Sequence, residues 1–600
     1  MLNFRFCVFF IFVLMLAACS SQQKQTAQPE ISPQEEHILV KVERLLIEQQ
    51  YLDAQDTLNS IDIFSLSELE QTNFYWLKAQ LSVYLGRGDD AITAMNAVPP
   101  GAFGQLGHVD PNAPGFLRAT ALHLQGQFIA SARERMFLSG VLADALYEQN
   151  HQAIWNSLLQ ADESGVEELA SKTTTRLFKG WLDLALIIKR NQIDIDKQLS
   201  KLRTWQVMYE EHPAAKELPG ELGQLEEYVE TKAKYVAVML PLSGKLASTG
   251  TALRDGIMAA YYQAKKAGAS VPEIRIYDTS KTKNFWSLYK QAILDGNELV
   301  IGPLAKQSVT RLQQESRLPV PTLALNYGKR DASENPEQLF QFGLAVEDEA
   351  ELAALYARQQ GYHNAIALVP KGPWGERVFK RFSETWQSEG GRLIEAQFFN
   401  GKGDYNKVIS KLFAIDDSER RARNLKKQLG ARIEFQARRR DDIDFIFVAA
   451  LPQQARQIKP TLAFNFAKDI PMIATSQIYS GKPSRIKDRD LNSVVFCDIP
   501  WMLENSKLKR QIHKLWPKSK GGLDRLYALG IDAYQLYPRL GQIKVLKNSS
   551  IRGQTGQLAM DRHGQIVRSL PFAIFEKGLA KKTQGYVAHA ESQQGTREGF

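Results

Sequence analysis

Hydrophobic and polar residues follow two different patterns along the chain, and the pattern changes near residue 233. From residue 34 to residue 232, apolar positions recur three and four residues apart, as at Leu39, Val42, Leu45 and Leu46. Residues at this spacing share one face of a helix. After residue 233, short continuous apolar runs alternate with amphipathic segments. The chain is therefore expected to consist of an all-α part followed by an α/β part.

Small residues mark a repeat within the helical part. Ala54, Ala91 and Ser131 each follow a turn-forming pair, and they lie 37 and then 40 residues apart. Helix pairs that stack into arrays need a small residue where two helices cross closely, with a turn before it. Residues 34–232 are therefore predicted to form an all-α, TPR-like helical repeat domain. An irregular helical bundle is the alternative.

The α/β part contains two sets of strand-like runs. Alternation of apolar strands with helices indicates a parallel sheet that is covered on both faces. Crossovers between the sets are expected near residues 341–344 and 494–500. Residues 233–579 are therefore predicted to form a two-lobed type I periplasmic-binding-protein (Venus flytrap) domain, with a hairpin at 554–576 and a disordered tail at 580–600. The predicted strands are 236–240, 274–277, 299–301, 322–325, 365–369, 393–399, 443–449 and 470–474.

The first residues carry the features of a bacterial export signal. Arg5 precedes an apolar stretch from Phe6 to Leu16, which is short for a membrane span. The quartet Leu16-Ala17-Ala18-Cys19 resembles a lipobox, in which the cysteine is acylated. We expect a signal peptide at 1–18, and a lipidated Cys19 with a flexible linker at 19–33. The Ser20 that follows implies sorting to the outer membrane. A signal peptide with an incidental cysteine is the alternative.

Charge separates the two parts of the chain. Residues 19–232 hold 18 Lys/Arg against 30 Asp/Glu, a net charge of −12, and residues 233–600 hold 56 against 36, a net charge of +20. This asymmetry suggests that the C-terminal part meets an acidic partner. The densest basic stretch runs from Arg420 to Arg440, and a second runs from Lys507 to Lys520. We do not expect nucleic acid as the partner, because an exported lipoprotein faces the periplasm. A solvated helix face is the alternative interpretation of the first stretch.

Catalytic and metal-binding patterns are missing from the sequence. It contains no His-Glu-x-x-His, Gly-x-Ser-x-Gly or Gly-x-x-x-x-Gly-Lys-Ser/Thr motif, and its nine histidines show no ligand spacing. Cys497 lies in an apolar run, so a buried, unreactive thiol is expected. We therefore expect a protein without catalytic residues, metal or cofactor.

Four stretches carry a resemblance to a known family. They are VAVMLPLSGKLASTGTALRDGIMAAYY, ELVIGPLAKQSV, PTLALNY and RRRDDIDFIFVAALPQQARQIKPTLAF. Together with the lipobox and the helical part, they resemble the LpoA family of gammaproteobacterial outer-membrane lipoproteins. The resemblance covers nearly the whole mature chain. It implies a non-catalytic regulator of peptidoglycan synthesis that binds and stimulates a class A penicillin-binding protein across the periplasm. The alternative is a lipid-anchored solute receptor of an importer.

Two candidate sites follow from the pattern. In a flytrap domain a small ligand sits at the carboxyl ends of the strands, and the residues expected there are Ser243, Gly244, Gly302, Pro303, Asn326, Tyr327 and Trp374. Leu304 occupies the position at which amino-acid receptors of this fold carry a hydroxyl, so a small ligand is not favoured. The candidate docking residues for the partner are the basic side chains Arg420, Arg421, Arg423, Arg438, Arg439 and Arg440.

Overall fold

The computed structural model describes most of the chain after residue 36. The described residues are 37–142, 144–191, 195–282, 284–329, 335–401, 405–429, 434–540, 551–561 and 563–583. The predicted signal peptide, Cys19 and the linker lie outside them, as do residues 584–600 of the predicted tail. Two compact units are present, residues 1–61 and residues 62–600. Within the described ranges, no helix combines the length and apolar character that a bilayer crossing requires.

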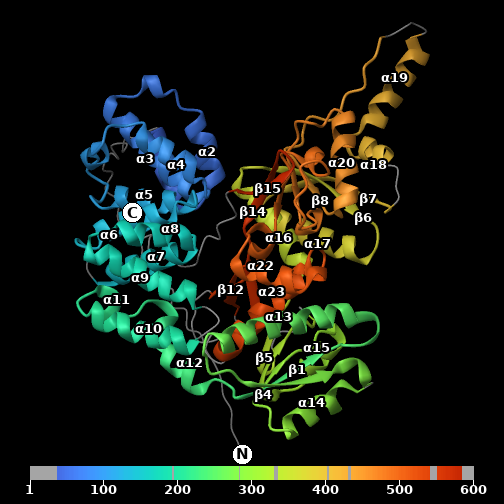
Figure 1. The fold of residues 1–600 in the computed structure, drawn as a ribbon. Coiled ribbons are helices and arrows are strands. Elements are labelled where there is room, and N and C mark those ends of the chain that lie inside the picture. Colours follow the sequence, from blue (N-terminus) through green and yellow to red (C-terminus); the bar gives the residue numbers. More distant parts are fainter. Residues whose placement is uncertain are drawn as a thin grey trace, which may run out of the picture. The chain divides into compact units, whose positions relative to one another are not determined.

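Helices alone make up residues 38–231 of the described chain, apart from turns and single 3-10 turns, as predicted (Figure 1). The first unit contains α1 (Ile38–Ile47) and α2 (Tyr51–Asn59). The second unit continues with α3 (Glu68–Tyr84), α4 (Gly88–Asn96), α5 (Ala113–Leu124), α6 (Phe128–Leu138), α7 (Asp144–Gln160), α8 (Glu163–Lys172), α9 (Arg176–Arg190), α10 (Ile195–Met208), α11 (Pro213–Lys216) and α12 (Leu225–Thr231).

The small residues of the predicted repeat lie in the second helix of successive helix pairs. Ala54 lies in α2, Ala91 in α4 and Ser131 in α6, and all three are fully buried. Ser131 Oγ donates a hydrogen bond to the carbonyl of Ala119 in α5, at 2.7 Å. A Cβ on Gly88 would lie 2.5 Å from the carbonyl oxygen of Ala121, so α4 and α5 approach too closely for a larger side chain. The repeat spacing therefore reflects close helix crossings.

The first lobe of the α/β part is an eight-stranded sheet in the order β11-β12-β13-β5-β4-β3-β1-β2. Strands β1 to β5 are parallel to one another, and β13 pairs with β5 in parallel. Strands β12 and β11 then extend the sheet through antiparallel pairs. The bounds are β1 (Tyr235–Leu240), β2 (Glu273–Asp278), β3 (Leu299–Ile301), β4 (Arg317–Ala324), β5 (Glu337–Phe342), β11 (Ile551–Arg552), β12 (Gln557–Met560) and β13 (Gln565–Ser569), with helices α13 (Ala247–Lys266), α14 (Phe285–Leu294), α15 (Lys306–Leu312) and α23 (Asp524–Leu536).

The second lobe is a seven-stranded sheet in the order β15-β14-β10-β9-β8-β6-β7. The strands are β6 (Asn364–Pro370), β7 (Arg392–Phe399), β8 (Phe445–Val448), β9 (Met472–Ala474), β10 (Val495–Cys497), β14 (Phe572–Glu576) and β15 (Leu579–Thr583). Its helices are α16 (Val346–Gln359), α17 (Pro373–Ser388), α18 (Tyr405–Leu412), α19 (Ile415–Leu429) and α20 (Pro452–Phe464). The short helices α21 (Pro500–Leu503) and α22 (Lys507–Leu515) follow β10. Two wound lobes in one domain confirm the predicted fold class.

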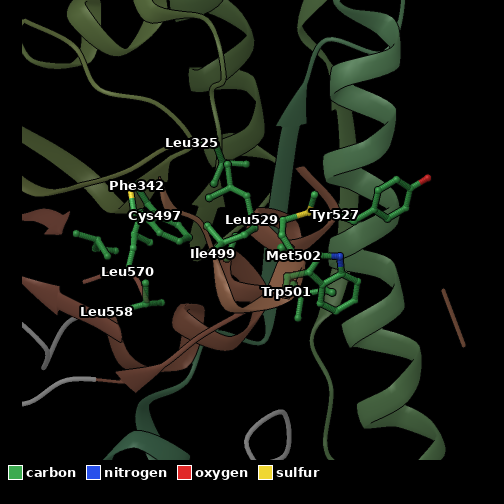
Figure 2. Close-up of a cluster of buried hydrophobic side chains, with 14 of the residues drawn as sticks. Leu325, Phe342, Cys497, Ile499, Trp501, Met502, Tyr527, Leu529, Leu558 and Leu570 are labelled. Carbon is green, nitrogen blue, oxygen red and sulfur yellow. The ribbon is translucent and has the colours of Figure 1, made fainter. Parts of the chain in front are cut away.

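Three chain crossings join the lobes, one more than the sequence indicated. They follow β5, β10 and β13, and Phe342, Cys497 and Leu570 from these crossings belong to one buried cluster (Figure 2). The third crossing divides the segment 554–576. Strands β12 and β13 form a hairpin in the first lobe, whereas β14 pairs with β10 and β15 in the second. The predicted hairpin is present as β12 and β13, but it ends at Ser569 and does not extend to residue 576 as expected. The last strand continues to Thr583, four residues past the expected boundary at 579.

Two glycines set the spacing between α13 and α23. A Cβ on Gly256 would lie 2.3 Å from the carbonyl oxygen of Tyr527, and one on Gly530 would lie 2.3 Å from that of Leu253. Because backbone atoms are the obstacle on both sides, no side-chain rotation can make room. The two helices therefore depend on glycine at this crossing.

We expect Gly256→Ala to lower the free energy of unfolding by about 1–3 kcal/mol, since the added methyl must push the two helices apart. Urea denaturation followed by circular dichroism measures the change. Gly522→Ala is the control, because a Cβ there meets no atom within 4 Å. Equal stability of the two variants would contradict this account of the crossing.

Candidate functional site

The candidate cleft residues that follow β1 are used in a turn. Ser243 Oγ donates a hydrogen bond to Asp278 Oδ2 at 3.1 Å, and the backbone N–H of Leu242 donates to Asp278 Oδ1 at 2.9 Å. Ser280 Oγ donates to the carbonyl of Ser243 at 2.9 Å. Gly244 begins the 3-10 turn before α13 with a φ of +70°. Helix α13 begins at Ala247. The hydrogen bond from the Ser243 hydroxyl to Asp278 joins the segment after β1 to the end of β2.

The candidate residues after β3 and β4 are buried or hydrogen-bonded within the first lobe. Gly302 and Pro303 are buried, and a Cβ on Gly302 would lie 2.2 Å from the carbonyl oxygen of Met239. Asn326 Nδ2 donates to the carbonyl of Leu304 at 2.9 Å. The hydroxyl of Tyr327 donates to the carbonyl of Ile566 in β13, also at 2.9 Å. These contacts hold the ends of β3 and β4 together and engage their polar groups within the protein.

Trp374 lies in the first turn of α17, half-buried against the core cluster that spans both lobes. A hollow in the first lobe is lined by Leu242, Ser243, Ile276, Tyr277, Asp278, Lys281 and Leu288. Of the seven candidate cleft residues, Ser243 alone lines this hollow. A ligand at the strand ends therefore remains a prediction, and it would have to displace existing hydrogen bonds.

The basic stretch from Arg420 to Arg440 divides into a helix and a returning segment. Its first five basic residues lie on α19, which Figure 1 shows as the outermost element of the second lobe, extending beyond α18 and α20. The chain is described again from Glu434. It then returns toward β8, with the N–H of Arg438 3.4 Å from Ser418 Oγ and the N–H of Arg440 3.1 Å from the carbonyl oxygen of Phe413.

Ion pairs neutralise part of this stretch. Arg420 pairs with Asp417, Arg423 with Glu419 at 3.6 Å, Arg439 with Asp469 at 2.6 Å and Arg440 with Asp442 at 2.7 Å. The side chains of Arg421, Lys426, Lys427 and Arg438 are exposed, and no ion pair joins them to a described acidic residue. These four cations, two of which the sequence analysis did not single out, are the part of the stretch best able to meet an outside anion.

The second basic stretch is partly structural. Lys509 is buried in α22 and donates hydrogen bonds to the carbonyls of Trp501 and Glu504, which caps the short helix α21. Lys507, Arg510 and Lys514 are exposed on the other side of α22. This stretch therefore presents fewer outward charges than its composition suggests.

A buried cluster of charged groups next to the lobe crossings was missed by sequence reasoning. Arg525 of α23 grips the carboxylate of Asp498, with Nη2–Oδ2 at 2.5 Å and Nε–Oδ1 at 3.0 Å, and also donates to the carbonyl of Ser476 at 2.9 Å. Glu349 of α16 accepts hydrogen bonds from the N–H and the hydroxyl of Ser476, at 3.0 and 2.9 Å. The available signal was a charged residue directly after an apolar strand, as in Val495-Phe496-Cys497-Asp498.

Burial dominates the electrostatics of this cluster. It raises the pKa of Glu349 to about 7, although the charges of Arg568 and Arg525 oppose the shift and Asp498 adds to it. Burial also raises the pKa of Asp498, against the ion pair with Arg525, and raises the pKa of the Cys497 thiol well above its usual value. The thiol is fully buried, as expected for an unreactive cysteine.

We expect a pH-dependent contribution of Glu349 to stability. Its folded pKa of about 7 lies above the ordinary value of 4.5, so the folded state holds the proton more tightly. The contribution of Glu349 to stability is therefore present at low pH and is lost as the pH rises toward 7. From about pH 4.5 to about pH 7.5, the stability of wild type relative to Glu349→Gln should fall by on the order of 2 kcal/mol.

Urea denaturation at a series of pH values measures this difference. Glu384→Gln, an exposed position on α17, is the matched control and should show a much smaller change. Parallel pH profiles for wild type and Glu349→Gln would contradict the assigned role of burial.

Comparison with known proteins supports one family over most of the chain. A family model described as LppC putative lipoprotein matches residues 17–578. The penicillin-binding protein activator LpoA of Photobacterium profundum is 28% identical over 546 residues, covering 90% of this chain and 87% of that protein. The protein of the same name from Vibrio cholerae is 28% identical over 589 residues, covering 93% and 96%.

Two solved structures from Haemophilus influenzae are similar over long ranges. Full-length LpoA aligns with 91% of this chain and 94% of its own, at 21% identity and a TM-score of 0.48. The LpoA C-domain, described as a regulator of PBP1A, aligns with 58% of this chain and 99% of its own, at 23% identity and a TM-score of 0.46. Because the family model spans nearly the whole sequence, the chain belongs to the LppC family of putative lipoproteins.

Proposed function

We propose that this protein binds a class A penicillin-binding protein and stimulates its synthesis of peptidoglycan, without catalysing a reaction itself. The observation that carries the proposal is family membership over residues 17–578, together with relatives named penicillin-binding protein activator that align with 90% or more of the chain. The sequence motifs support the same function independently, because they include no catalytic pattern and one lipobox.

Stimulation requires that the protein distinguish two states of the synthase. A regulator that bound the active and inactive states equally would shift nothing, so it must bind the active state more tightly. The proposed docking surface is the basic stretch, which carries exposed cations on an element that projects from its lobe. The solute-receptor alternative is less favoured, because the hydroxyl or amide groups of Ser243, Asn326 and Tyr327 are already hydrogen-bonded within the protein.

The direct test measures the rates of glycan polymerisation and peptide cross-linking by the purified cognate synthase, with and without the detergent-solubilised lipoprotein. We expect at least one of the two rates to rise in a saturable way. Unchanged rates at saturating concentrations of the lipoprotein would contradict the proposed function. A thermal shift with small metabolites in place of the synthase would favour the receptor alternative.

Reversal of the exposed charges should weaken docking. We expect Arg421→Glu, Lys426→Glu and Lys427→Glu together to lower the affinity for the synthase about tenfold or more and to reduce its salt dependence, since these cations lack described partners of their own. Biolayer interferometry at several salt concentrations measures both effects.

The matched control reverses three exposed lysines elsewhere, Lys265, Lys266 and Lys306, which changes the net charge by the same amount. We also expect Arg439→Ser to have a smaller effect than the triple reversal, because Arg439 is already paired with Asp469. Equal losses in the triple variant and its control would show that net charge, and not this surface, governs binding.

The anchor should depend on Cys19. Multiple acyl chains hold a protein stably at a bilayer, since each buried methylene contributes about 0.8 kcal/mol. We expect Cys19→Ser to release the protein from the outer-membrane fraction, as measured by fractionation and immunoblotting. Retention of the variant in that fraction would contradict acylation at Cys19.

A further inference from the structure

Helix α19 carries an apolar stripe at the spacing of a helix–helix seam. Ile415, Ser418, Ala422, Leu425 and Leu429 follow one another at intervals of three, four, three and four residues. Positions at this spacing form one continuous line along a helix and match the core positions of a two-stranded coiled coil. The stripe is therefore suited to contact along its whole length.

Only the inner end of this stripe is covered by the protein itself. Ile415 and Ser418 are buried, and Ile415 belongs to the core of the second lobe. Farther along the helix Leu425 is 47% exposed and Leu429 is 60% exposed. Phe435, at the start of the returning segment, is 43% exposed. The stripe thus leaves the core and continues outward as an apolar surface with no described cover.

The helix dipole explains the order of charges along α19, but it does not explain the exposed leucines. Acidic Asp416 and Asp417 lie near the amino end and basic Lys426 and Lys427 near the carboxyl end, as the helix dipole favours. A solvated helix of this kind needs no large apolar side chains on its outer turns. Leu425 and Leu429 lie four residues apart on one face of the helix and so form one contiguous apolar patch, which is the kind of exposed surface that a partner covers.

Charge identifies the chemistry of that partner. In a paired helix the positions beside the seam select the partner by charge, and beside the outer half of this seam they are occupied by Arg421, Lys426 and the uncharged Gln428. A second copy of the chain would bring the same cations against each other. A membrane surface is poorly matched, because two leucines and one phenylalanine offer little apolar area for insertion. An acidic amphipathic helix provides both an apolar face that packs on the seam and carboxylates that pair with the cations beside it.

We infer that the outer half of α19 is a docking seam for an acidic amphipathic helix. This helix packs its apolar face on Ala422, Leu425 and Leu429 and places its carboxylates against Arg421 and Lys426. The inference rests on the proposed function, since the helix is assigned to the synthase. So small a seam makes a weak contact by itself, and it therefore adds to contacts made elsewhere on the protein.

The test replaces the exposed leucines of the full-length lipoprotein. Leu425→Ser with Leu429→Ser should lower the affinity for the purified cognate synthase about tenfold or more while leaving the salt dependence of binding unchanged. The matched control is Leu294→Ser with Ile486→Ser, which removes two apolar side chains that are 81% and 88% exposed. Circular dichroism and thermal melting establish that both variants fold.

The outcomes separate this inference from the proposed function. If wild type binds and stimulates the synthase and the leucine variant does so equally well, the seam is overturned and the proposed function stands. If wild type neither binds nor stimulates the synthase, both the seam and the proposed function are overturned. Loss of affinity in the leucine variant alone supports the seam.

The chemistry of the occupant has its own test. A photo-crosslinking residue at Gln428, which lies beside the seam, should capture a segment of the synthase with acidic residues flanking apolar positions at helical spacing. Capture of a basic or extended segment would overturn the assignment, as would capture of a second copy of this chain. Binding of the protein to anionic phospholipid vesicles, abolished by Leu425→Ser with Leu429→Ser, would also overturn it in favour of a membrane surface.

Discussion

The ion pair between Arg525 and Asp498 is the interaction on which the arrangement of the two lobes depends. The arginine belongs to α23, which packs on the first lobe, whereas the carboxylate follows β10 of the second. Asp498 directly follows Cys497, which lies in one buried cluster with Phe342 and Leu570 of the other two crossings (Figure 2). A two-pronged pair of this kind is strong only while both partners are present, because either charge alone would be buried without compensation. The lobes are therefore joined by covalent crossings and by a charge pair at the same place.

The same region shows why a receptor fold need not be a receptor. A ligand-binding cleft requires polar groups that wait for a ligand, yet Ser243, Asn326 and Tyr327 hold other parts of the protein together. The buried charges near the crossings are likewise engaged with one another. The exposed cations and leucines lie instead on the outside of the second lobe, where α19 carries them away from the core. In the proposed docking, the fold supports this projecting helix.

Charge acts in two distinct ways in this protein. In the interior it is held by an ion pair, as at Arg525 and Asp498, or by hydrogen bonds, as at Glu349. Burial shifts the ionisation of Glu349 toward the neutral form. On the surface, a basic excess follows the acidic helical part along the chain. The ion pairs of the basic stretch show that counting residues overstates a surface charge, because most of the arginines singled out there are matched by nearby acids, as Arg439 is by Asp469. Exposed and unmatched cations, not the total, determine what the surface attracts.

The sequence by itself determined the elements and the fold class, because periodicity reports which face of each element is buried. Strand β3 has the predicted bounds, and the small residues Ala54 and Ala91 occupy the predicted helix pairs. Periodicity says nothing about which distant elements meet. Only the tertiary structure could therefore divide β13 from β14 between the lobes, bring Arg525 to Asp498, and assign the polar groups of the candidate cleft to internal hydrogen bonds. It also decided that the stripe of α19, regular in sequence from Ile415 to Leu429, is core at one end and open surface at the other, because the lobe ends halfway along the helix.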